Sequence, residues 1–535
     1  MWFLDIYWAS LLILVPCVTL VLGRNIAIHA FGRFSASTAA AAANPKKGHE
    51  EGEEEVDRQD VDEANRFRWL FLRVYLLVMG SEWLQGPYMY TLLKDEKNYP
   101  DRTVALLYMA AYISAAVSAP LTGYFADRIG RRTACLAYCA IHSLASLSVL
   151  SSMLEVIVVG RVLAGVGTTL LWSVFESWMV AEYNARGLGQ GQCNGRLPLS
   201  AMYGVMTTYN CITAILAGLV AHCVVLALGS KTHLFILALV RNYMLTFIWF
   251  RPIMKYSTAA VIILRTWTEN RGESSSGRSL QQVDDESTES LGGRLLDSLK
   301  NVRVWVLSLV SCCFEGTIFL FMYYWPGALQ DAHDHSTDPD AAPNHQLPFG
   351  VIFASFMAIM VLGALLFDIL MTRHGRSPSD ESDALIKKHL PVGLLTTALL
   401  LGGLGFLAAA FLGHREAPLL CAFLLLEACN GLYVPSMGYQ RSQVVSDARR
   451  ASVYGFMNIP LFVSVALALI TTNGGQVGDH RHVVFFFCAG LLFAAGLGAF
   501  AGLRVRSSPE KEYAEIKGQD SDEFQPEGHL AERNT

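Results

Sequence analysis

The segment from Gly123 to Arg132, "GYFADRIGRR", joins two long apolar runs and is the most informative stretch of the chain for its architecture. An arginine-rich loop between apolar runs is typical of the cytoplasmic side of a membrane protein. That interpretation explains the arginines but neither Asp127 nor the spacing of the glycines. Asp127 at a helix end can pair with basic groups, and the glycines permit close approach and a tight turn. We therefore predict a gating motif composed of Gly123, Asp127, Arg128, Gly130, Arg131 and Arg132.

The composition of the whole chain is that of a membrane protein. Of its 535 residues, 53% are hydrophobic and 16% are charged, whereas about 25% of residues are charged in soluble domains. The net charge of -5 argues against a nucleic-acid partner, which needs clustered basic surface. We therefore expect the lipid bilayer to surround this chain and nucleic acid not to be a partner.

The apolar residues are gathered into runs long enough to cross a bilayer. A spanning helix needs about 20 mainly apolar residues, and the sequence contains thirteen such runs. They lie near residues 2–22, 69–92, 103–126, 133–152, 156–180, 199–228, 233–250, 304–326, 348–371, 389–412, 418–438, 451–472 and 483–503. The first run lacks a basic start and is long for a signal peptide, which favours a retained membrane anchor.

The distribution of lysine and arginine predicts the orientation of these runs. Basic residues, Arg441 among them, gather in alternate loops together with the gating motif, so we assign these loops to the cytoplasm. Two polar, low-complexity segments, 35–65 and 272–292, are predicted to be unstructured. The resulting domains are an extra amino-terminal helix at 1–23, a cytoplasmic linker at 24–68, a six-helix bundle at 69–264, a cytoplasmic loop at 265–303, a second six-helix bundle at 304–505 and a disordered cytoplasmic tail at 506–535.

A weak internal repeat relates the two bundles. Glu82 in the first core helix corresponds to Glu315 in the seventh, and tyrosines and a proline follow both. The phrase "RIGRR" is echoed by "RHGRS" after the second helix of the other half, and "GRLPL" is echoed by "MNIPL". Two six-helix halves with corresponding features are the architecture of a secondary transporter, whose binding site lies between the halves.

Charged residues inside the apolar runs are candidate functional residues. Each is costly in a membrane unless it faces a cavity or a partner. The candidates of this kind are Glu82, Arg161, Glu176, Arg241, Glu315, Asp368 and Glu427. Structural ion pairs between helices are the alternative explanation for each of them. Arg161 and Glu176 share a broad helical face but lie about 22 Å apart along it.

The first core helix carries the phrase "EWLQGPYMY". Glu82 and Gln85 are three residues apart, so we expect them to share one face of the helix. Gly86 and Pro87 follow directly, and a proline in a helix frees carbonyl groups and bends it. The pattern predicts a polar, kinked cavity wall. The alternative is that Pro87 marks only the end of the helix and that Glu82 is paired structurally.

Metal binding and catalysis have little support in the sequence. The stretch "DAHDHSTDPDAAPNHQ", near residues 331–346, contains histidines and aspartates, but nothing orders them as ligands, which favours a solvated linker. The eleven cysteines are scattered through apolar segments and are interpreted as small buried hydrophobes. Phosphate-binding, nucleophile-elbow and zinc-protease motifs are absent from the sequence. We therefore predict neither a cofactor nor a metal site nor enzymatic activity.

Two resemblances follow from these motifs. The gating motif resembles the signature loop of the major facilitator superfamily. The phrases "EWLQGPYMY", "GRVLAGVGTTLLWSVFESW", "TWTEN", "FEGTIFLFMYYWPGAL", "GVIFASFMAIMVLGA" and "NGLYVPSMGY" are similar to those of the molybdate-anion transporter family, over residues 69–505. The resemblance implies an all-helical membrane protein of two six-helix bundles plus one extra amino-terminal helix. It also implies uptake of molybdate, a dianion, by alternating access.

The resemblance also suggests roles for the candidate residues. Asn458 stands where it implies an arginine, so the positive charge for the anion is left to Arg161, Arg196 or Arg241. Gln85, Tyr88, Tyr324 and Asn458 are candidate neutral donors. Glu82, Glu315 or Glu427 are candidates for carrying a coupling proton, because an apolar cavity favours the neutral carboxyl. Glu176 completes the set of substrate-binding or coupling candidates.

Two other functions remain open at the level of sequence. A major facilitator carrier for another oxyanion, an organic anion or a sugar would share nearly every feature. A non-transporting membrane sensor would use the cytoplasmic segments as its output. We expect a monomer in the plasma membrane, with an endomembrane as the alternative.

Overall fold

The structure of the protein is a computed structural model. It describes residues 6–43, 51–188, 199–243, 259–270, 302–336, 347–373, 381–444, 450–471 and 477–503. All regular secondary structure in these ranges is helical. The predicted loop at 272–292 and the predicted tail at 506–535 lie outside the described residues.

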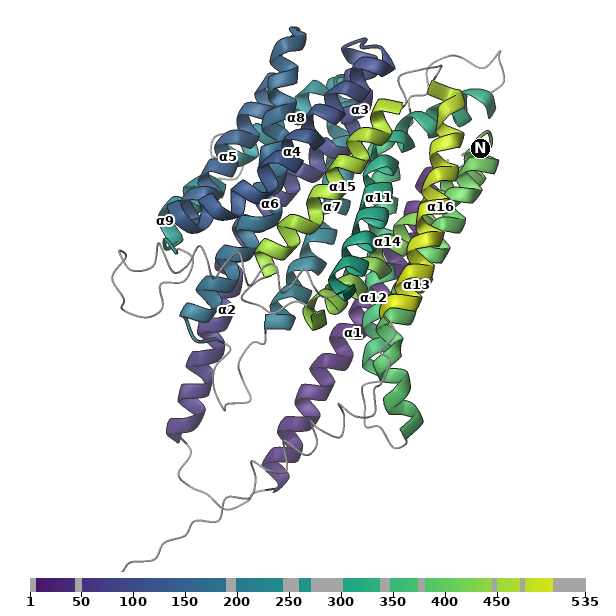
Figure 1. The fold of residues 1–535 in the computed structure, drawn as a ribbon. Coiled ribbons are helices and arrows are strands. Elements are labelled where there is room, and N and C mark those ends of the chain that lie inside the picture. Colours follow the sequence, from purple (N-terminus) through teal and green to yellow (C-terminus); the bar gives the residue numbers. More distant parts are fainter. Residues whose placement is uncertain are drawn as a thin grey trace, which may run out of the picture.

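The helices fall into two groups that follow the order of the chain (Figure 1). In Figure 1, α4, α5, α6 and α8 lie on one side and α11, α13, α14 and α16 on the other, with α7 and α15 between them. The first group comprises α2 (Glu51–Gln85), α4 (Asp101–Ile129), α5 (Arg131–Ser148), α6 (Leu154–Ala185), α7 (Leu199–Leu228), α8 (Thr232–Tyr243) and the short α9 (Ala259–Thr266). The second group comprises α11 (Val302–Ser336), α12 (Phe349–Arg373), α13 (Glu381–Leu412), α14 (Glu416–Val444), α15 (Arg450–Thr471) and α16 (Val477–Leu503).

Each of the thirteen predicted apolar runs contains a helix, counting α1 (Ile6–Ala43) before the two groups. Within the described residues, nine helices are long and apolar enough to cross a membrane. The run at 69–92 is not among them because its helix carries polar residues such as Glu82 and Gln85. The described part of α8 is only 12 residues long.

The prediction of an unstructured segment at 35–65 was wrong for most of its length. α1 continues to Ala43, and α2 begins at Glu51, so only 44–50 lie outside the described residues. The physical reason is helix propensity, since the first part is a run of alanines. Glutamates in the first turns of α2 also suit the positive end of the helix dipole.

The Gly-Pro pair interrupts the first core helix, as the sequence predicts. α2 ends at Gln85, and a 3-10 turn at Gly86–Tyr88 leads into α3 (Met89–Thr91). A π-helical turn at Leu92–Glu96 completes the segment. Because proline has no backbone N–H, the regular hydrogen-bond ladder cannot continue through Pro87.

Among the described residues, the largest apolar core shared by the two groups of helices takes its first-group residues mainly from the end that the charge distribution assigns to the outside. A small cluster of Ala115, Ala116 and Phe462 joins the groups as well. The larger cluster of buried residues joins Leu84, Tyr88 and Tyr108 of the first group to residues such as Tyr323 and Phe349 of the second. At the other end of the first group, its helices form a separate buried cluster. This cluster contains residues of that group alone, from Ala64 to Trp267. The structure therefore represents a state in which the halves are packed together at the predicted outer end.

Close backbone packing holds the halves together where α7 crosses α12. A Cβ atom added to Gly218 would lie 2.7 Å from the carbonyl oxygen of Gly350, and one added to Gly350 would lie 2.3 Å from that of Gly218. Any side chain at either position would push the two helices apart. α4 and α15 form the second contact between the halves.

The extra helix α1 packs on the second half, against α12. Tyr7 donates a hydrogen bond of 2.5 Å to Glu416 at the start of α14. Ser10 lies 3.1 Å from Ser355 of α12, hydroxyl to hydroxyl. His333 near the end of α11 contacts the same oxygen of Glu416 at 3.1 Å, between Nδ1 and Oε1. These contacts attach α1 to the second half, so we expect it to move with that half.

Membrane orientation can be tested at the two ends of α6. Ser152 precedes this helix, Asn184 lies in its last turn, and both are exposed. We expect an impermeant thiol reagent added to intact cells to label Ser152→Cys and to label Asn184→Cys only after permeabilisation, in a background without other reactive cysteines. Labelling of both variants from the same side would contradict the orientation that the basic residues predict.

Candidate functional site

A polar network connects α2 to α5 in the middle of the first half. Glu82 accepts a hydrogen bond of 3.2 Å from the hydroxyl of Tyr138. Nδ1 of His142 lies 3.2 Å from the same carboxylate oxygen. The Glu82 side chain is 32% exposed and that of His142 only 6%, so an accessible carboxylate is joined to a buried imidazole.

Gln85 extends this network by one further step. Its side-chain nitrogen lies 3.2 Å from Nε2 of His142 and donates to the hydroxyl of Ser146 at 3.1 Å. Glu82 and Gln85 therefore point to the same neighbour, as the three-residue spacing predicts. Gln85 is buried, so it faces α5 and not an open cavity.

His142 was not among the residues singled out from the sequence. A signal was present, because Tyr138, His142 and Ser146 follow one another at intervals of four and so share one face of α5. Polar groups repeated on one face of an apolar helix indicate a polar partner on the neighbouring helix. An isolated histidine, however, carries little information until that partner is known.

Arg161 lies on α6, seven residues from its predicted outer end. The carbon at the centre of its guanidinium lies 5.0 Å from the centroid of the Tyr108 ring, and its Nε donates to the carbonyl of Leu107 at 3.4 Å. No carboxylate lies within ion-pair distance of Arg161 in the described part of the chain. It is therefore a positive charge that still needs an anion.

Tyrosines of both halves lie next to Arg161 on the outer side. The Tyr108 ring packs against Tyr323 of α11 with 5.0 Å between centroids. The Tyr90 ring also packs against Tyr323, with 5.5 Å between the ring centroids. Because Tyr323 belongs to the second half, this aromatic cluster closes the space between the halves beside Arg161.

The other tyrosine candidates take part in packing contacts. The hydroxyl of Tyr88 accepts a hydrogen bond of 3.1 Å from the backbone nitrogen of Gly350, which joins the two halves. Tyr324 is buried against Tyr323 and Phe485 of the second half. Neither hydroxyl contacts Arg161.

Glu176 and Glu315 have partners on neighbouring helices. Glu176 accepts a hydrogen bond of 2.7 Å from the hydroxyl of Tyr203 on α7. Glu315 forms an ion pair of 2.9 Å with Arg441 and accepts a hydrogen bond of 3.0 Å from Tyr433. Arg441 lies within α14 and not in a cytoplasmic loop as predicted. The pairing explains how a charge is accommodated there.

Glu427 is the most deeply buried carboxylate among the candidates, with no exposed surface. One oxygen accepts a hydrogen bond of 3.1 Å from Asn430, and the other has no hydrogen-bond partner within the described residues. α12 and α14 approach closely beside it, since a Cβ atom at Gly431 would lie 1.9 Å from the carbonyl oxygen of Met360. This close packing leaves little space for an anion at Glu427.

Several predicted site residues cannot be placed at the level of side chains. Arg196 lies outside the described residues, as do the side chains of Arg241, Asn458 and Asp127, while Gly123 is described only as part of α4. Asp368 lies near the end of α12 and is exposed. The roles predicted for these residues stay predictions.

The gating motif forms a compact unit with Glu269, a residue of the "TWTEN" phrase. Glu269 accepts hydrogen bonds from the backbone nitrogens of Arg132 at 2.9 Å and Thr133 at 3.2 Å, so it caps the start of α5. Gly130 has φ of 120°, and a Cβ atom there would lie 2.3 Å from the Glu269 carboxylate. The motif therefore needs glycine at this position, and the sequence analysis did not identify Glu269.

Two arginines of the motif bind backbone carbonyls in the same unit. Arg131 donates to Ser177 at 3.2 Å, and Arg132 donates to Leu264 at 2.8 Å. Arg128 lies in the last turn of α4 and is exposed. The arginines thus connect α5 to α6 and α9 at the predicted cytoplasmic end.

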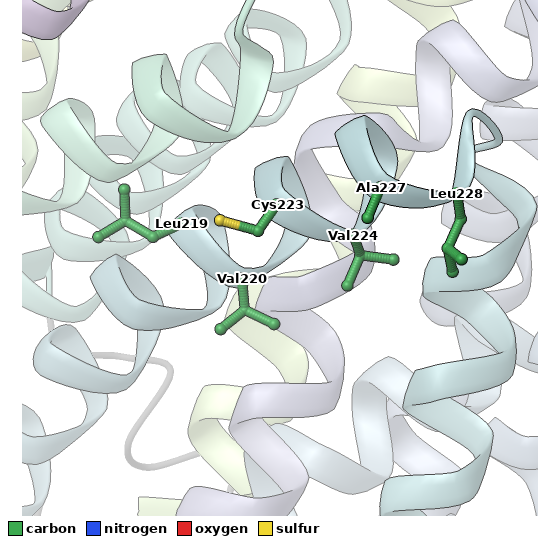
Figure 2. A pocket seen from close by; sticks show the side chains of 6 residues that line it. All are labelled: Leu219, Val220, Cys223, Val224, Ala227 and Leu228. Atoms are coloured by element: carbon green, nitrogen blue, oxygen red, sulfur yellow. The ribbon is translucent and has the colours of Figure 1, made fainter.

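Two other places do not qualify as a substrate site. The histidine and aspartate stretch is partly helical, since α11 continues to Ser336, and no group of metal-ligating residues forms among the residues described. Figure 2 shows a hollow along α7, lined by Leu219, Val220, Cys223, Val224, Ala227 and Leu228. This apolar surface offers no donor or charge to an anion.

The ion pair in the second half leads to a prediction. We expect Arg441→Leu to lower the stability of the protein by about 1.5–3 kcal/mol, because Glu315 then keeps its charge without its cation. Adding Glu315→Gln to that variant should restore part of the loss. Thermal unfolding in detergent measures both effects, and equal melting temperatures for Arg441→Leu and the wild type would contradict a structural role for the pair.

Sequence and structure comparisons agree with this arrangement. The sequence profile of a family described as "sugar transporters, 12 TM" matches residues 36–387, more than half of the chain. The chain belongs to this family. It is a branch of the major facilitator superfamily, so the protein is a multi-pass membrane transporter and not an enzyme.

Curated relatives match most of the length of this chain. A protein of Danio rerio named molybdate-anion transporter is 28% identical over 527 residues, which are 93% of this chain and 95% of the relative. A protein of Xenopus tropicalis with the same name is 29% identical, over 79% of this chain and 83% of the relative. The resemblance to that group, which was predicted from short phrases, is confirmed.

Solved major facilitator structures share the fold. The nucleoside transporter NupG superposes with a TM-score of 0.55 at 12% identity, over 82% of this chain and all of that chain. The xylose transporter XylE of E. coli gives a TM-score of 0.51 at 14% identity, over 82% of this chain and 96% of that chain. These likenesses confirm the predicted helical transporter fold.

Proposed function

We propose that the protein is a secondary transporter that takes up molybdate by alternating access. Two observations support the proposal in general: the transporter fold, and relatives named molybdate-anion transporter that match most of the chain. The observation that carries it is Arg161, a membrane-embedded cation with no carboxylate partner in the described residues. An unpaired charge in a membrane is costly, and an oxyanion would remove that cost.

Arg161 has the geometry that an oxyanion needs. Its Nε binds the carbonyl of Leu107 and its face covers Tyr108, which fix the orientation of the guanidinium. The two terminal nitrogens are left for the anion, and a guanidinium can present two parallel N–H groups to two oxygens. The carboxylates that the sequence offered as structural partners are engaged elsewhere, Glu82 with His142 and Glu427 with Asn430.

The aromatic cluster of Tyr90, Tyr108 and Tyr323 is the outer barrier in this proposal. It lies beside Arg161 and contains residues of both halves. Opening toward the outside requires Tyr323 to leave Tyr108 as the halves rock. The anion would then reach Arg161 from the outside and leave through the opposite end after the cluster closes.

The remaining assignments follow from this function. Arg196 and Arg241 are proposed as further anion ligands, and Asn458 as a neutral donor. Asp127 with its motif is proposed to stabilise one of the two states. We propose further that the protein acts as a monomer in the plasma membrane, where uptake from outside the cell takes place.

Competition between anions tests the substrate. In cells that express the protein, we expect tungstate, which matches molybdate in charge and nearly in size, to inhibit uptake of labelled molybdate. Sulfate is smaller and should inhibit less at the same concentration. Uptake that is unaffected by tungstate and abolished by a neutral sugar would contradict the proposal and favour a carrier for another solute.

A further inference from the structure

We propose that His142, paired with Glu82, is a proton-binding site that couples anion uptake to a proton gradient. This inference rests on the proposed function, because it assigns a driving ion to the same transport cycle. It assigns a role to His142 and a chemical state to each member of the network between α2 and α5. The proton binds at Nε2 of His142 from the outside and leaves that atom on the inside.

The hydrogen-bond partners of His142 let us assign a protonation state to its ring. The hydroxyl of Ser146 donates to the carbonyl of His142 at 3.0 Å, so its oxygen is left to accept from the side-chain nitrogen of Gln85. The same Gln85 nitrogen faces Nε2 of His142 at 3.2 Å, and an amide nitrogen can only donate. With the Gln85 amide in this orientation, we assign Nε2 as the acceptor.

The other ring nitrogen completes the assignment. Nδ1 lies 3.2 Å from Glu82 Oε1, a carboxylate oxygen that also accepts from Tyr138. An ionised carboxylate only accepts, so we assign the hydrogen of the neutral ring to Nδ1. The state that is closed at the predicted outer end is thus a state with the proton released.

Proton binding requires one local change. A hydrogen on Nε2 would meet the hydrogens of the Gln85 amide, so the amide must turn to present its oxygen. Gln85 is the last residue of α2 before the 3-10 turn at Gly86–Tyr88, and Tyr88 binds Gly350 of the other half. Movement of the halves can therefore change the position of Gln85 relative to His142.

The surroundings supply few competing charges. On α5, Tyr138 stacks on the His142 ring with 5.4 Å between ring centroids. Cys139, three residues before His142, is buried. On α6, Arg161 interacts electrostatically with Glu82. On α8, which also packs on α5, His233 contacts the carbonyl of Ser230 instead. The carboxylate of Glu82 is the acidic group in direct contact with the His142 ring.

Coupling follows from the charge of the substrate. A dianion that enters a cell with a negative interior moves against the membrane potential, and the cost grows with the charge carried. A proton that crosses with it reduces the net charge moved and adds the energy of its own gradient.

Purified protein in liposomes tests the inference. With the membrane potential clamped at zero, an inward gradient of about one pH unit should accumulate labelled molybdate about tenfold for each coupled proton, since a tenfold ratio corresponds to one unit. His142→Gln should lose this accumulation while it still exchanges labelled for unlabelled molybdate. His233→Gln is the matched control and should behave as the wild type in both assays.

A second measurement avoids dependence on the variant. Addition of molybdate to wild-type liposomes should make an unbuffered outside medium more alkaline, because protons enter with the anion. Exchange without accumulation or alkalinisation in the wild type, or accumulation that persists in His142→Gln, would overturn the proton site and leave molybdate transport intact. Absence of exchange in the wild type would overturn molybdate transport itself and the coupling with it.

Discussion

Arg161→Lys should reduce the rate of molybdate uptake by at least about tenfold although it keeps the positive charge. A charge-assisted hydrogen bond contributes about 1.5–3 kcal/mol, and each 1.4 kcal/mol corresponds to about a tenfold change. An ammonium cannot present two parallel N–H groups to two oxygens of a tetrahedral anion. It also cannot place a planar guanidinium over the Tyr108 ring.

Initial rates of labelled molybdate uptake, normalised to the amount of protein at the cell surface, measure this effect. Arg102→Lys is a suitable control, because Arg102 is exposed at the predicted outer end of α4 and belongs to no part of the site. We expect the control to transport like the wild type. Normal uptake by Arg161→Lys would show that Arg161 does not bind the anion.

Gly130→Ala should be the most destabilising substitution in the gating motif. Gly130 has φ of 120°, a conformation that costs an alanine about 1–3 kcal/mol. The added Cβ would also displace Glu269, which lies 2.3 Å from its position. The start of α5 would then lose the carboxylate that accepts from Arg132 and Thr133.

A second glycine with a positive φ provides a comparison. Gly187 has φ of 64°, but a Cβ atom there would meet nothing within 4 Å. We expect Gly187→Ala to lower the melting temperature in detergent clearly less than Gly130→Ala. Equal changes in the two variants would mean that contact with Glu269 contributes nothing.

Several features of the first core helix were predictable because they depend on neighbours in sequence. The three-residue spacing of Glu82 and Gln85 places both on the face that meets His142. The Gly-Pro pair predicts the end of α2, which stops at Gln85. Such features need only helix periodicity and the missing N–H of proline.

The partners of the charged residues could not be predicted in the same way. Arg441 is separated from Glu315 by 126 residues, and Glu269 is separated from Arg132 by 137. Both pairs depend on how distant helices pack. The sequence therefore identified Glu315 as a costly charge but not the arginine that neutralises it, and it identified the gating motif but not the carboxylate that caps α5.

The same limit applied to the choice among the candidate anion ligands. From the sequence, Arg161 was equivalent to other arginines of the chain, and a pair with Glu82 or Glu427 was open. The structure gives those carboxylates other partners, His142 and Asn430. The remaining positive charge at Arg161 is the basis for proposing an anion site there.

Uptake by the purified protein in liposomes tests the central claim most directly. Liposomes that contain the wild-type protein should take up labelled molybdate at a rate that saturates with concentration and falls when tungstate is added. Liposomes without protein and liposomes with Arg161→Lys provide the background. No molybdate uptake by wild-type protein that does carry a different solute, such as a sugar, would contradict the account.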